Sequence, residues 1–141
     1  MKAEIKQIQG LALAGKTDSG HWIPMNSSVE VGGSNAGARP LELVLLGLGG
    51  CTSMDVISIL KKKRVLFTHY ECHLEAECAA QDPKVFTRIH IEFLLYGDNI
   101  NSQAVERAIE LSVTRYCSVL AMLNKSAEIT TGFKINPVHP S

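Results

Sequence analysis

The feature that most constrains the fold of this 141-residue chain is a long apolar run from Leu41 to Leu60, which ends in the cationic sequence KKKR. Pro40 precedes the run and is a natural first-turn residue for a helix, and the cations favour the dipole at a helix C-terminus. The pattern predicts one helix from Pro40 to about Lys63. Because its apolar side chains occupy almost every face, this helix should be buried at the centre of the core.

Charge and the N-terminal sequence bear on the compartment. Glu42 and Asp55 interrupt the apolar run, which argues against a membrane-spanning helix. The first residues, MKAEIKQIQG, lack the apolar stretch and cleavage site of a secretory signal. Fourteen basic residues balance fourteen acidic ones, so no net field favours nucleic acid or an anionic membrane. We therefore expect a cytoplasmic protein whose partners include neither nucleic acid nor a membrane.

Alternating patterns predict strands on either side of the helix. Two strands are expected near residues 2–14 and 20–25, around the turn-rich sequence AGKTDSG. A flexible stretch rich in Gly, Ser and Asn then leads to the helix. The alternation within residues 69–78 and 86–96 predicts an antiparallel hairpin that is apolar on one face.

A second helix and a last strand complete the pattern. Asn101 or Ser102 can cap a helix whose apolar stripe runs from Val105 to Leu123, and the sequence AEITTGFKI predicts the last strand. The order β-β-α-β-β-α-β describes a single α+β domain over residues 1–141, since no repeat or linker divides the chain. A few short strands leave much of the first helix uncovered, so we expect a second subunit to cover it.

Two of the four cysteines, Cys72 and Cys78, fall on the apolar face of the predicted hairpin. Small buried fillers are the commonest case at such positions. A zinc site formed with His69 and His73 is the alternative. The histidines point to the opposite face, however, and their spacing matches no common zinc pattern. We therefore interpret Cys72 and Cys78 as core fillers.

Cys51 lies next to a cluster of glycines in the first helix. Gly47, Gly49 and Gly50 each cost roughly 1 kcal/mol relative to alanine in a helix interior, so something is expected to approach the helix backbone closely there. A facing helix, a second subunit or a substrate would each explain the cluster. From the residues alone, packing and a functional thiol are equally supported for Cys51; Cys117, on the second helix, is the other candidate thiol.

A reactive thiol requires a neighbour that favours the thiolate, usually a cation or a helix N-terminus. Cys51 lies about three turns into its helix, and Arg39 would be roughly 18 Å away along the helix axis. Arg115 precedes Cys117 by two positions and therefore faces a different side of its helix. An activating arginine must come from another segment or from a second subunit.

Two motifs carry a resemblance to a known family. The sequences RPLELVLLGLGGCTSMDVISILKKKR and SVTRYCSVLAML, with correctly ordered strands between them, resemble the OsmC/Ohr family. The resemblance covers nearly the whole chain, and it is to the OsmC-like branch with a GGCxxxDVxxIL helix and a YCSV motif. It implies an OsmC-like fold with antiparallel sheets around a long central helix, and an intertwined homodimer in which two such helices pack together.

The resemblance also implies a function, because characterised members are thiol-dependent peroxidases that reduce organic hydroperoxides. It gives Cys51 the role of the peroxidatic cysteine, which becomes a sulfenic acid, and Cys117 that of the resolving cysteine, which forms a disulfide with it. An external dithiol would restore both thiols. No metal, flavin or nicotinamide cofactor is required. Glu42 is the candidate for the family's catalytic glutamate.

The sequence departs from the family pattern near the residues that activate the thiol. Leu41 occupies the position of the usual glutamate, and the adjacent Glu42 is rotated from it by about 100° on a helix. Arg39 is the only arginine upstream, and YCSV replaces the usual Cys-Pro after the second cysteine. These departures favour an alternative function, in which a non-peroxidase relative binds a small ligand or senses redox state at the dimer interface.

Overall fold

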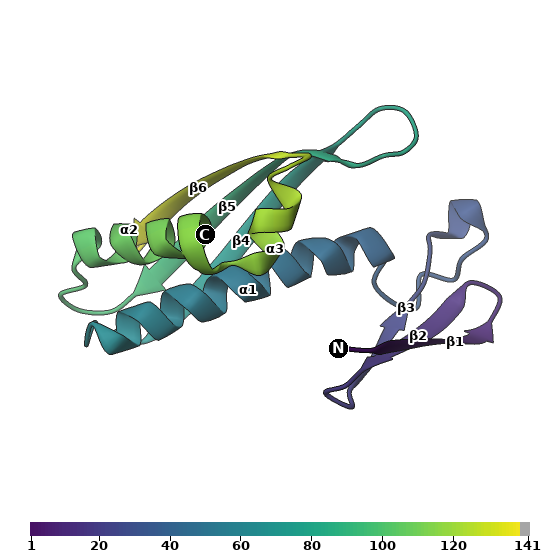
Figure 1. Cartoon of the computed structure of the whole chain (residues 1–141), viewed down its shortest axis with the longest axis horizontal. Helices are drawn as coiled ribbons and strands as arrows, with labels where there is room; N and C mark the ends of the chain where they lie inside the picture. Colours follow the sequence, from purple (N-terminus) through teal and green to yellow (C-terminus); the bar gives the residue numbers. More distant parts are fainter. Residues whose placement is uncertain (139–141) are drawn as a thin grey trace. The chain divides into compact units, whose positions relative to one another are not determined.

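The computed structural model describes residues 1–138, which form two compact units, one from Met1 to Leu46 and one from Gly47 onward (Figure 1). The boundary falls inside helix α1 (Pro40–Lys62), and the bounds of this helix confirm the prediction from the apolar run. The α+β class is also as predicted. That the whole chain is a single domain stays a prediction.

The first unit contains a three-stranded antiparallel sheet made of β1 (Ala3–Gln9), β2 (Ala12–Thr17) and β3 (Trp22–Met25), in that order. The prediction of two strands is therefore wrong. The chain reverses direction at Gly10, whose φ of 55° lies in the left-handed region that glycine adopts at low cost. Much of the sequence AGKTDSG consequently belongs to β2 and not to a turn.

One buried side chain organises the stretch between β3 and α1. Asn26 is 3% exposed, and its Oδ1 accepts hydrogen bonds from the backbone N–H groups of Ser27 at 2.8 Å and Ser34 at 3.0 Å. Its Nδ2 donates to Ser34 Oγ at 2.9 Å. These bonds close a loop around the short 3₁₀ helix η1 (Val29–Val31), so the stretch that was expected to be flexible is tied together at its ends.

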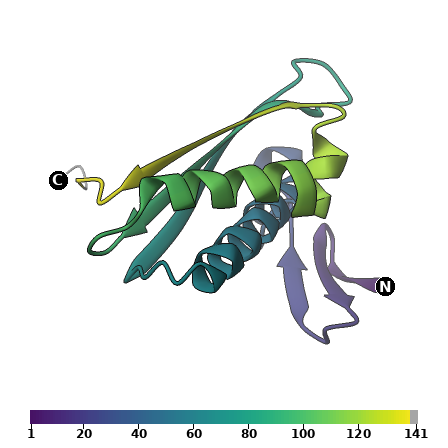
Figure 2. The ribbon, with the colours of Figure 1, turned by 60° about the vertical axis from the view of Figure 1, so that its left-hand side comes forward.

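The second unit is built on a sheet in the order β4-β5-β6. The strand β4 (His69–Cys78) pairs antiparallel with β5 (Phe86–Tyr96), and β6 (Glu128–Ile135) pairs parallel with β5. The predicted hairpin and the last strand are thus confirmed, whereas the expectation of antiparallel sheets is wrong for the β5–β6 pair. The inward-facing residues of β5, which are at most 1% exposed, are Ile89, Ile91, Phe93 and Leu95. Helix α2 (Ser102–Leu111) and the part of α1 in this unit lie on one face of the sheet (Figure 2).

The second predicted helix is interrupted at its cysteine. The Asn101 side chain caps α2 as expected. A π-helical turn, η2 (Ser112–Tyr116), follows, and Cys117 then has an extended backbone with φ −72° and ψ 103° before helix α3 (Ser118–Leu123). The Cys117 N–H donates to the carbonyl of Ser112, five residues back. The expectation of one continuous helix is wrong because this wider turn keeps the apolar spacing while it breaks the α-helical bonding.

Within a single chain, α1 is buried along one stripe only, which consists of Leu48, Gly49, Thr52, Val56 and Leu60. Apolar side chains elsewhere on the helix are exposed, and Met54 retains 74% of its accessible area. A helix buried on all sides is therefore not achieved by one chain. By length and composition α1 could cross a membrane. This is weak evidence for a membrane span, because the core helix of a soluble protein passes the same test.

Candidate functional site: a thiol pair with a carboxylate

Cys51 and Cys117 are 66 positions apart in the sequence and meet in the second unit. Cys51 is half-buried in the middle of α1, and Cys117 is the N-cap residue of α3 and 3% exposed. The two Sγ atoms and a carboxylate oxygen of Asp55 all lie within 4.8 Å of one another. The structure brings together the two thiols that the sequence singled out and adds a carboxylate beside them.

Asp55 reaches the thiols because it lies one helical turn after Cys51, on the same face of α1. Ser112, which is fully buried in the π turn, donates its hydroxyl hydrogen to Asp55 Oδ2 at 3.0 Å. The backbone carbonyl of Ser112 also accepts the N–H of Cys117 at 2.9 Å. A single residue of the π turn thus orients the carboxylate and holds the backbone of the second thiol.

The Cys117 thiol is held in its protonated form. Burial, and after it the contact with Cys51, raise the pKa of Cys117 to about 11. The backbone N–H of Leu120, 3.3 Å from Sγ, acts in the opposite direction but does not offset the burial. Within residues 1–138, no cation is among the groups that shift this pKa. At neutral pH a base must therefore remove the proton before Cys117 can act as a nucleophile.

The other two cysteines lie on β4 and differ from each other. Cys72 is half-buried opposite Phe93 of β5. Burial raises the pKa of Cys72, and a hydrogen bond with Ser53 acts in the opposite direction. A register shift between Glu77 and Cys78 interrupts the alternation, and Cys78 is exposed. The interpretation of Cys78 as a core filler is therefore wrong, whereas Cys72 is partly buried as expected.

The histidines of β4 engage a carboxylate and not the cysteines. Nε2 of His73 lies 2.8 Å from Glu71 Oε2, and Nε2 of His69 lies 3.1 Å from Glu71 Oε1. Both imidazoles are exposed, on the strand face opposite Cys72. These contacts agree with the parity argument against a zinc site made of the histidines and cysteines of this strand.

Glu42 lies in the first turn of α1, within the first unit. Its carboxylate accepts a hydrogen bond from the backbone N–H of Arg39 at 2.8 Å and one from Arg39 Nη1 at 2.9 Å. The backbone bond is the acidic half of a helix capping box. These bonds, the backbone one first, lower the pKa of Glu42. The pair is preorganised and half-exposed, and its participation in the chemistry of Cys51 stays a prediction.

Among the described residues 1–138, only one of the clustered glycines has a close neighbour. A Cβ at Gly49 would lie 2.6 Å from Leu74 Cδ1, so this glycine lets α1 approach β4. A Cβ at Gly47 or Gly50 would meet no atom of residues 1–138 within 4 Å, apart from the adjoining backbone of α1 itself. Close packing of the helix backbone is therefore confirmed at Gly49, while the other two glycines face open space in a single chain.

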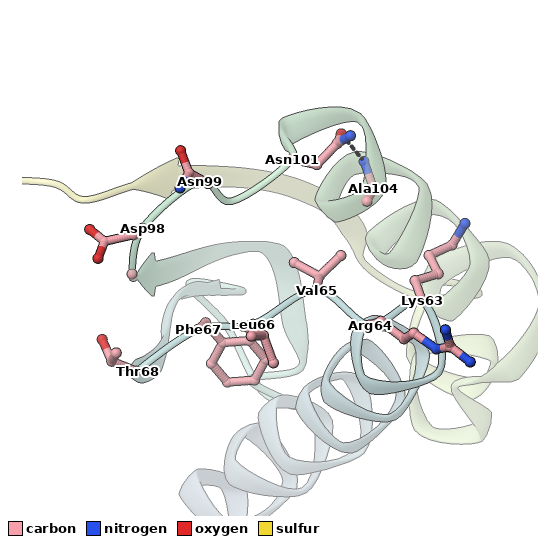
Figure 3. Close-up of a pocket in the computed structure, with 11 residues that line it drawn as sticks. Lys63, Arg64, Val65, Leu66, Phe67, Thr68, Asp98, Asn99, Asn101 and Ala104 are labelled. Carbon is pink, nitrogen blue, oxygen red and sulfur yellow. Dashed lines mark hydrogen bonds between the residues drawn. The ribbon is translucent and has the colours of Figure 1, made fainter.

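A large cavity of the described residues lies away from the thiols. It is an open groove of about 800 Å³ between the end of α1 and the turn that precedes α2, lined by Lys63–Thr68, Gly97–Asn99, Asn101 and Ala104 (Figure 3). A smaller groove of about 350 Å³ opens beside Asp55 and is lined also by Ser58, Ile59, Lys62, Lys63, Leu111 and Tyr116. We assign the site by its chemistry, because the larger groove contains neither cysteine.

Sequence reasoning missed Asp55 and Ser112. A signal for the first was present, since Asp55 is a charged residue four positions after Cys51 in an otherwise apolar run. Nothing local pointed to Ser112, which is 57 positions away from Asp55 along the chain.

The chain is an α+β protein in which two thiols meet in the second unit. Comparison with known proteins identifies its family. A family model described as OsmC-like protein matches residues 32–132, and the chain therefore belongs to the OsmC-like family. Protein YhfA of Escherichia coli (strain K12) is 38% identical over 135 residues, which cover 96% of this chain and 98% of YhfA. The family resemblance seen in the sequence is thus confirmed.

Solved structures show the same fold. A hypothetical protein from Aquifex aeolicus VF5 is 30% identical, with a TM-score of 0.84 over 96% of this chain and 95% of that one. An organic hydroperoxide resistance protein, OsmC, from Legionella pneumophila has a TM-score of 0.71 over 94% of this chain and 95% of that one. Because the Legionella protein is 13% identical to this chain, this second similarity shows the fold alone.

Proposed function

We propose that this chain is a cytoplasmic, thiol-dependent peroxidase that reduces organic hydroperoxides through Cys51, with Cys117 as the resolving cysteine. The observation that carries the proposal is the convergence of the two Sγ atoms within 4.8 Å from distant parts of the sequence. Membership of the OsmC-like family, in which the Legionella protein is an organic hydroperoxide resistance protein, supports a redox or hydroperoxide-related role.

The proposed reaction has three balanced steps. The Cys51 thiolate attacks the peroxide O–O bond; with one proton the products are an alcohol and a Cys51 sulfenic acid. The Cys117 sulfur then displaces the sulfenic hydroxyl group, which leaves as water when it takes the Cys117 proton. An external dithiol reduces the Cys51–Cys117 disulfide by exchange and becomes a disulfide itself.

Asp55 suits the second step because its carboxylate lies beside both sulfurs. The Cys117 thiol is protonated at neutral pH, and a carboxylate within reach can accept that proton as the S–S bond forms. Cys117 also lies at a break between helical segments, where it has an extended backbone and caps α3. We propose Asp55 as the base for resolution; Ser112 positions it.

Activation of Cys51 requires a positive charge that the carboxylate does not supply. We propose that Glu42 holds Arg39 for this purpose, through the ion pair at the start of α1, and that the pair acts across a homodimer. The exposed apolar side chains of α1 support a second copy as the covering partner, among them Leu46, which is 63% exposed, and Met54. A monomeric mass at micromolar concentration would contradict this part of the proposal.

The test is an assay of cumene hydroperoxide reduction with a dithiol as reductant. Cys51→Ser should lower the rate by at least about a thousandfold, because serine does not form the sulfenic acid. Cys72→Ser is the matched control, since it replaces a thiol of the same unit outside the pair, and it should retain the rate within about twofold. Activity that survives in Cys51→Ser would overturn the proposed mechanism.

A second candidate function is a redox sensor that forms the disulfide once and does not turn over. The observation that favours it is the departure from the family pattern near the thiol, where Leu41 occupies the position of the usual glutamate. The same assay separates the two functions. A peroxidase consumes many equivalents of hydroperoxide per chain, whereas a sensor consumes one and stops, even with excess dithiol.

A further inference from the structure

We propose that Cys51, Asp55 and Cys117 form a binding site for a soft divalent cation, with Zn²⁺ as the best match, when both thiols are reduced. We call these three residues the thiol–carboxylate cluster. Their ligand atoms lie within 4.8 Å of one another. Two of the residues share one face of α1, and the third comes from the junction between η2 and α3.

The distances are compatible with tetrahedral coordination after a small contraction. Zinc binds cysteine sulfur at about 2.3 Å and carboxylate oxygen at about 2.0–2.2 Å, which places neighbouring ligand atoms roughly 3.5–3.8 Å apart. The cluster therefore has to close by about 1 Å. The half-buried Cys51 side chain can supply this movement by rotation about its Cα–Cβ bond, since Cys117 is held by hydrogen bonds through its backbone and its Sγ.

A neighbouring hydrogen bond presents the carboxylate to the cluster. Ser112 donates to Asp55 Oδ2, and among residues 1–138 this is the only hydrogen bond described for the Asp55 side chain. Its Oδ1 is therefore available as a ligand. Partners of this kind fix the orientation of a ligating group and strengthen its binding to the metal.

The ligand set selects the class of metal. Two thiolates favour Zn²⁺ or Cu(I) over Mg²⁺ and Ca²⁺, and the carboxylate favours the divalent ion. Three protein ligands leave a fourth position for water. Asp55 also lines the groove of about 350 Å³ between α1 and the η2 region, which offers a path for the ion.

Binding would change the chemistry of the pair. Each bound ion displaces the two thiol protons and forms two metal–sulfur bonds, so the same sulfurs are withheld from peroxide and from each other. A soft divalent ion would thus protect the reduced pair. This protective consequence rests on the proposed peroxidase function, whereas the binding itself does not.

The experiment titrates the reduced full-length chain with Co²⁺ under argon and then displaces the Co²⁺ with Zn²⁺. Thiolate coordination should give sulfur-to-cobalt charge-transfer bands in the near ultraviolet, saturating at one Co²⁺ per chain. Protein oxidised to the Cys51–Cys117 disulfide should give none. Reduced protein without these bands would overturn the site, whatever the peroxidase assay gives, and a failed peroxidase assay would leave the site standing.

Variants locate the bound ion. Cys51→Ser and Asp55→Asn should each weaken Co²⁺ binding by at least about a hundredfold, and Ser112→Ala, which removes only the supporting hydrogen bond, by about tenfold. Cys72→Ser and Cys78→Ser are matched controls and should bind as the wild type does. Circular dichroism verifies that each variant is folded. Bands that persist in Cys51→Ser, or that disappear in Cys72→Ser, would place the ion elsewhere and overturn the proposal.

Discussion

Two regions of this molecule each contain two cysteines. The two cysteines of one region lie close together, whereas those of the other lie far apart. In the helical region, Cys51 and Cys117 are 66 positions apart and meet beside a carboxylate. On β4, Cys72 and Cys78 are six positions apart, which is about 20 Å along an extended strand. One of these strand thiols is half-buried and the other is exposed.

The difference shows that sequence spacing alone does not identify a reactive pair. A strand separates residues that share its face, whereas a helix and the break between η2 and α3 converge on one point. The helical pair also has a buried serine and a carboxylate around it. We therefore place the proposed thiol chemistry in the helical region. The two cysteines of β4 serve as internal controls in the experiments that test it.

Among the changes that leave Cys51 in place, the largest expected effect comes from the second thiol. Cys117→Ser should lower multiple-turnover peroxidase activity by at least about a hundredfold, because no partner remains to resolve the Cys51 sulfenic acid. The first turnover should still occur and leave a sulfenic acid that a 1,3-dicarbonyl reagent traps. Cys78→Ser, the matched change on β4, should turn over normally. If the two variants behave alike, the helical pair has no special role.

The next effect concerns alkaline stability. The pKa of Cys117 is raised from an ordinary value of 9.0 to about 11, so between these values the unfolded chain releases the proton and the folded protein retains it. The free energy of unfolding should then fall as the pH rises from about 9 to 11, by on the order of 2 kcal/mol. Below pH 9 the Cys117 thiol is protonated in both the folded and the unfolded state, so the free energy of unfolding is not reduced by this group.

Urea unfolding of the reduced protein at pH 8 and pH 10.5 measures this loss. Cys117→Ser should remove most of it, whereas Cys78→Ser, which replaces an exposed thiol, should leave it unchanged. A residual slope is expected from Cys72 and Tyr70, because burial raises the pKa of both groups. An unchanged slope in Cys117→Ser would contradict the burial of this thiol.

A smaller effect is expected at Glu42 and Arg39, the residues proposed to activate Cys51, and it distinguishes their role from that of the two thiols. Glu42→Gln removes the charge that holds Arg39 and should lower the rate of Cys51 oxidation by about tenfold. Glu110→Gln is the matched control, because Glu110 forms a similar exposed ion pair with Arg107 three residues away on a helix. Stopped-flow kinetics with excess hydroperoxide measures the rate. Equal rates in the two variants would remove Glu42 from the proposed machinery.

The smallest effect tests how closely α1 approaches β4. Gly50→Ala should raise the free energy of unfolding by about 1 kcal/mol, because alanine favours a helix and a Cβ there meets no atom. Gly49→Ala should lose this gain, since its Cβ would lie 2.6 Å from Leu74. Urea unfolding compares the two. A larger gain at Gly49 would contradict the packing, and a loss at Gly50 would place the second subunit against that glycine.

The elements with strong local patterns could be predicted from the sequence. The bounds of α1 followed from Pro40, the apolar run and the cationic end, and the β4–β5 hairpin followed from strict alternation. The N-terminal strands were harder, because their alternation is partial and the turn at Gly10 carries little sequence signal. Family membership followed from the two cysteine motifs.

The missed features depend on irregular backbone or distant contacts. The π turn before Cys117 preserves the spacing of apolar residues, so periodicity alone predicts one helix. The register shift between Glu77 and Cys78 likewise leaves the alternation of the sequence intact. The bond between Asp55 and Ser112 exists only because two helical segments meet in the folded chain.

The most direct test of the central claim is a map of the cysteines after oxidation. The reduced protein is treated with one equivalent of cumene hydroperoxide, alkylated, digested and analysed by mass spectrometry. We expect a peptide pair joined by a Cys51–Cys117 disulfide, with Cys72 and Cys78 alkylated as free thiols. A disulfide that includes either strand cysteine, or four alkylated thiols, would contradict it.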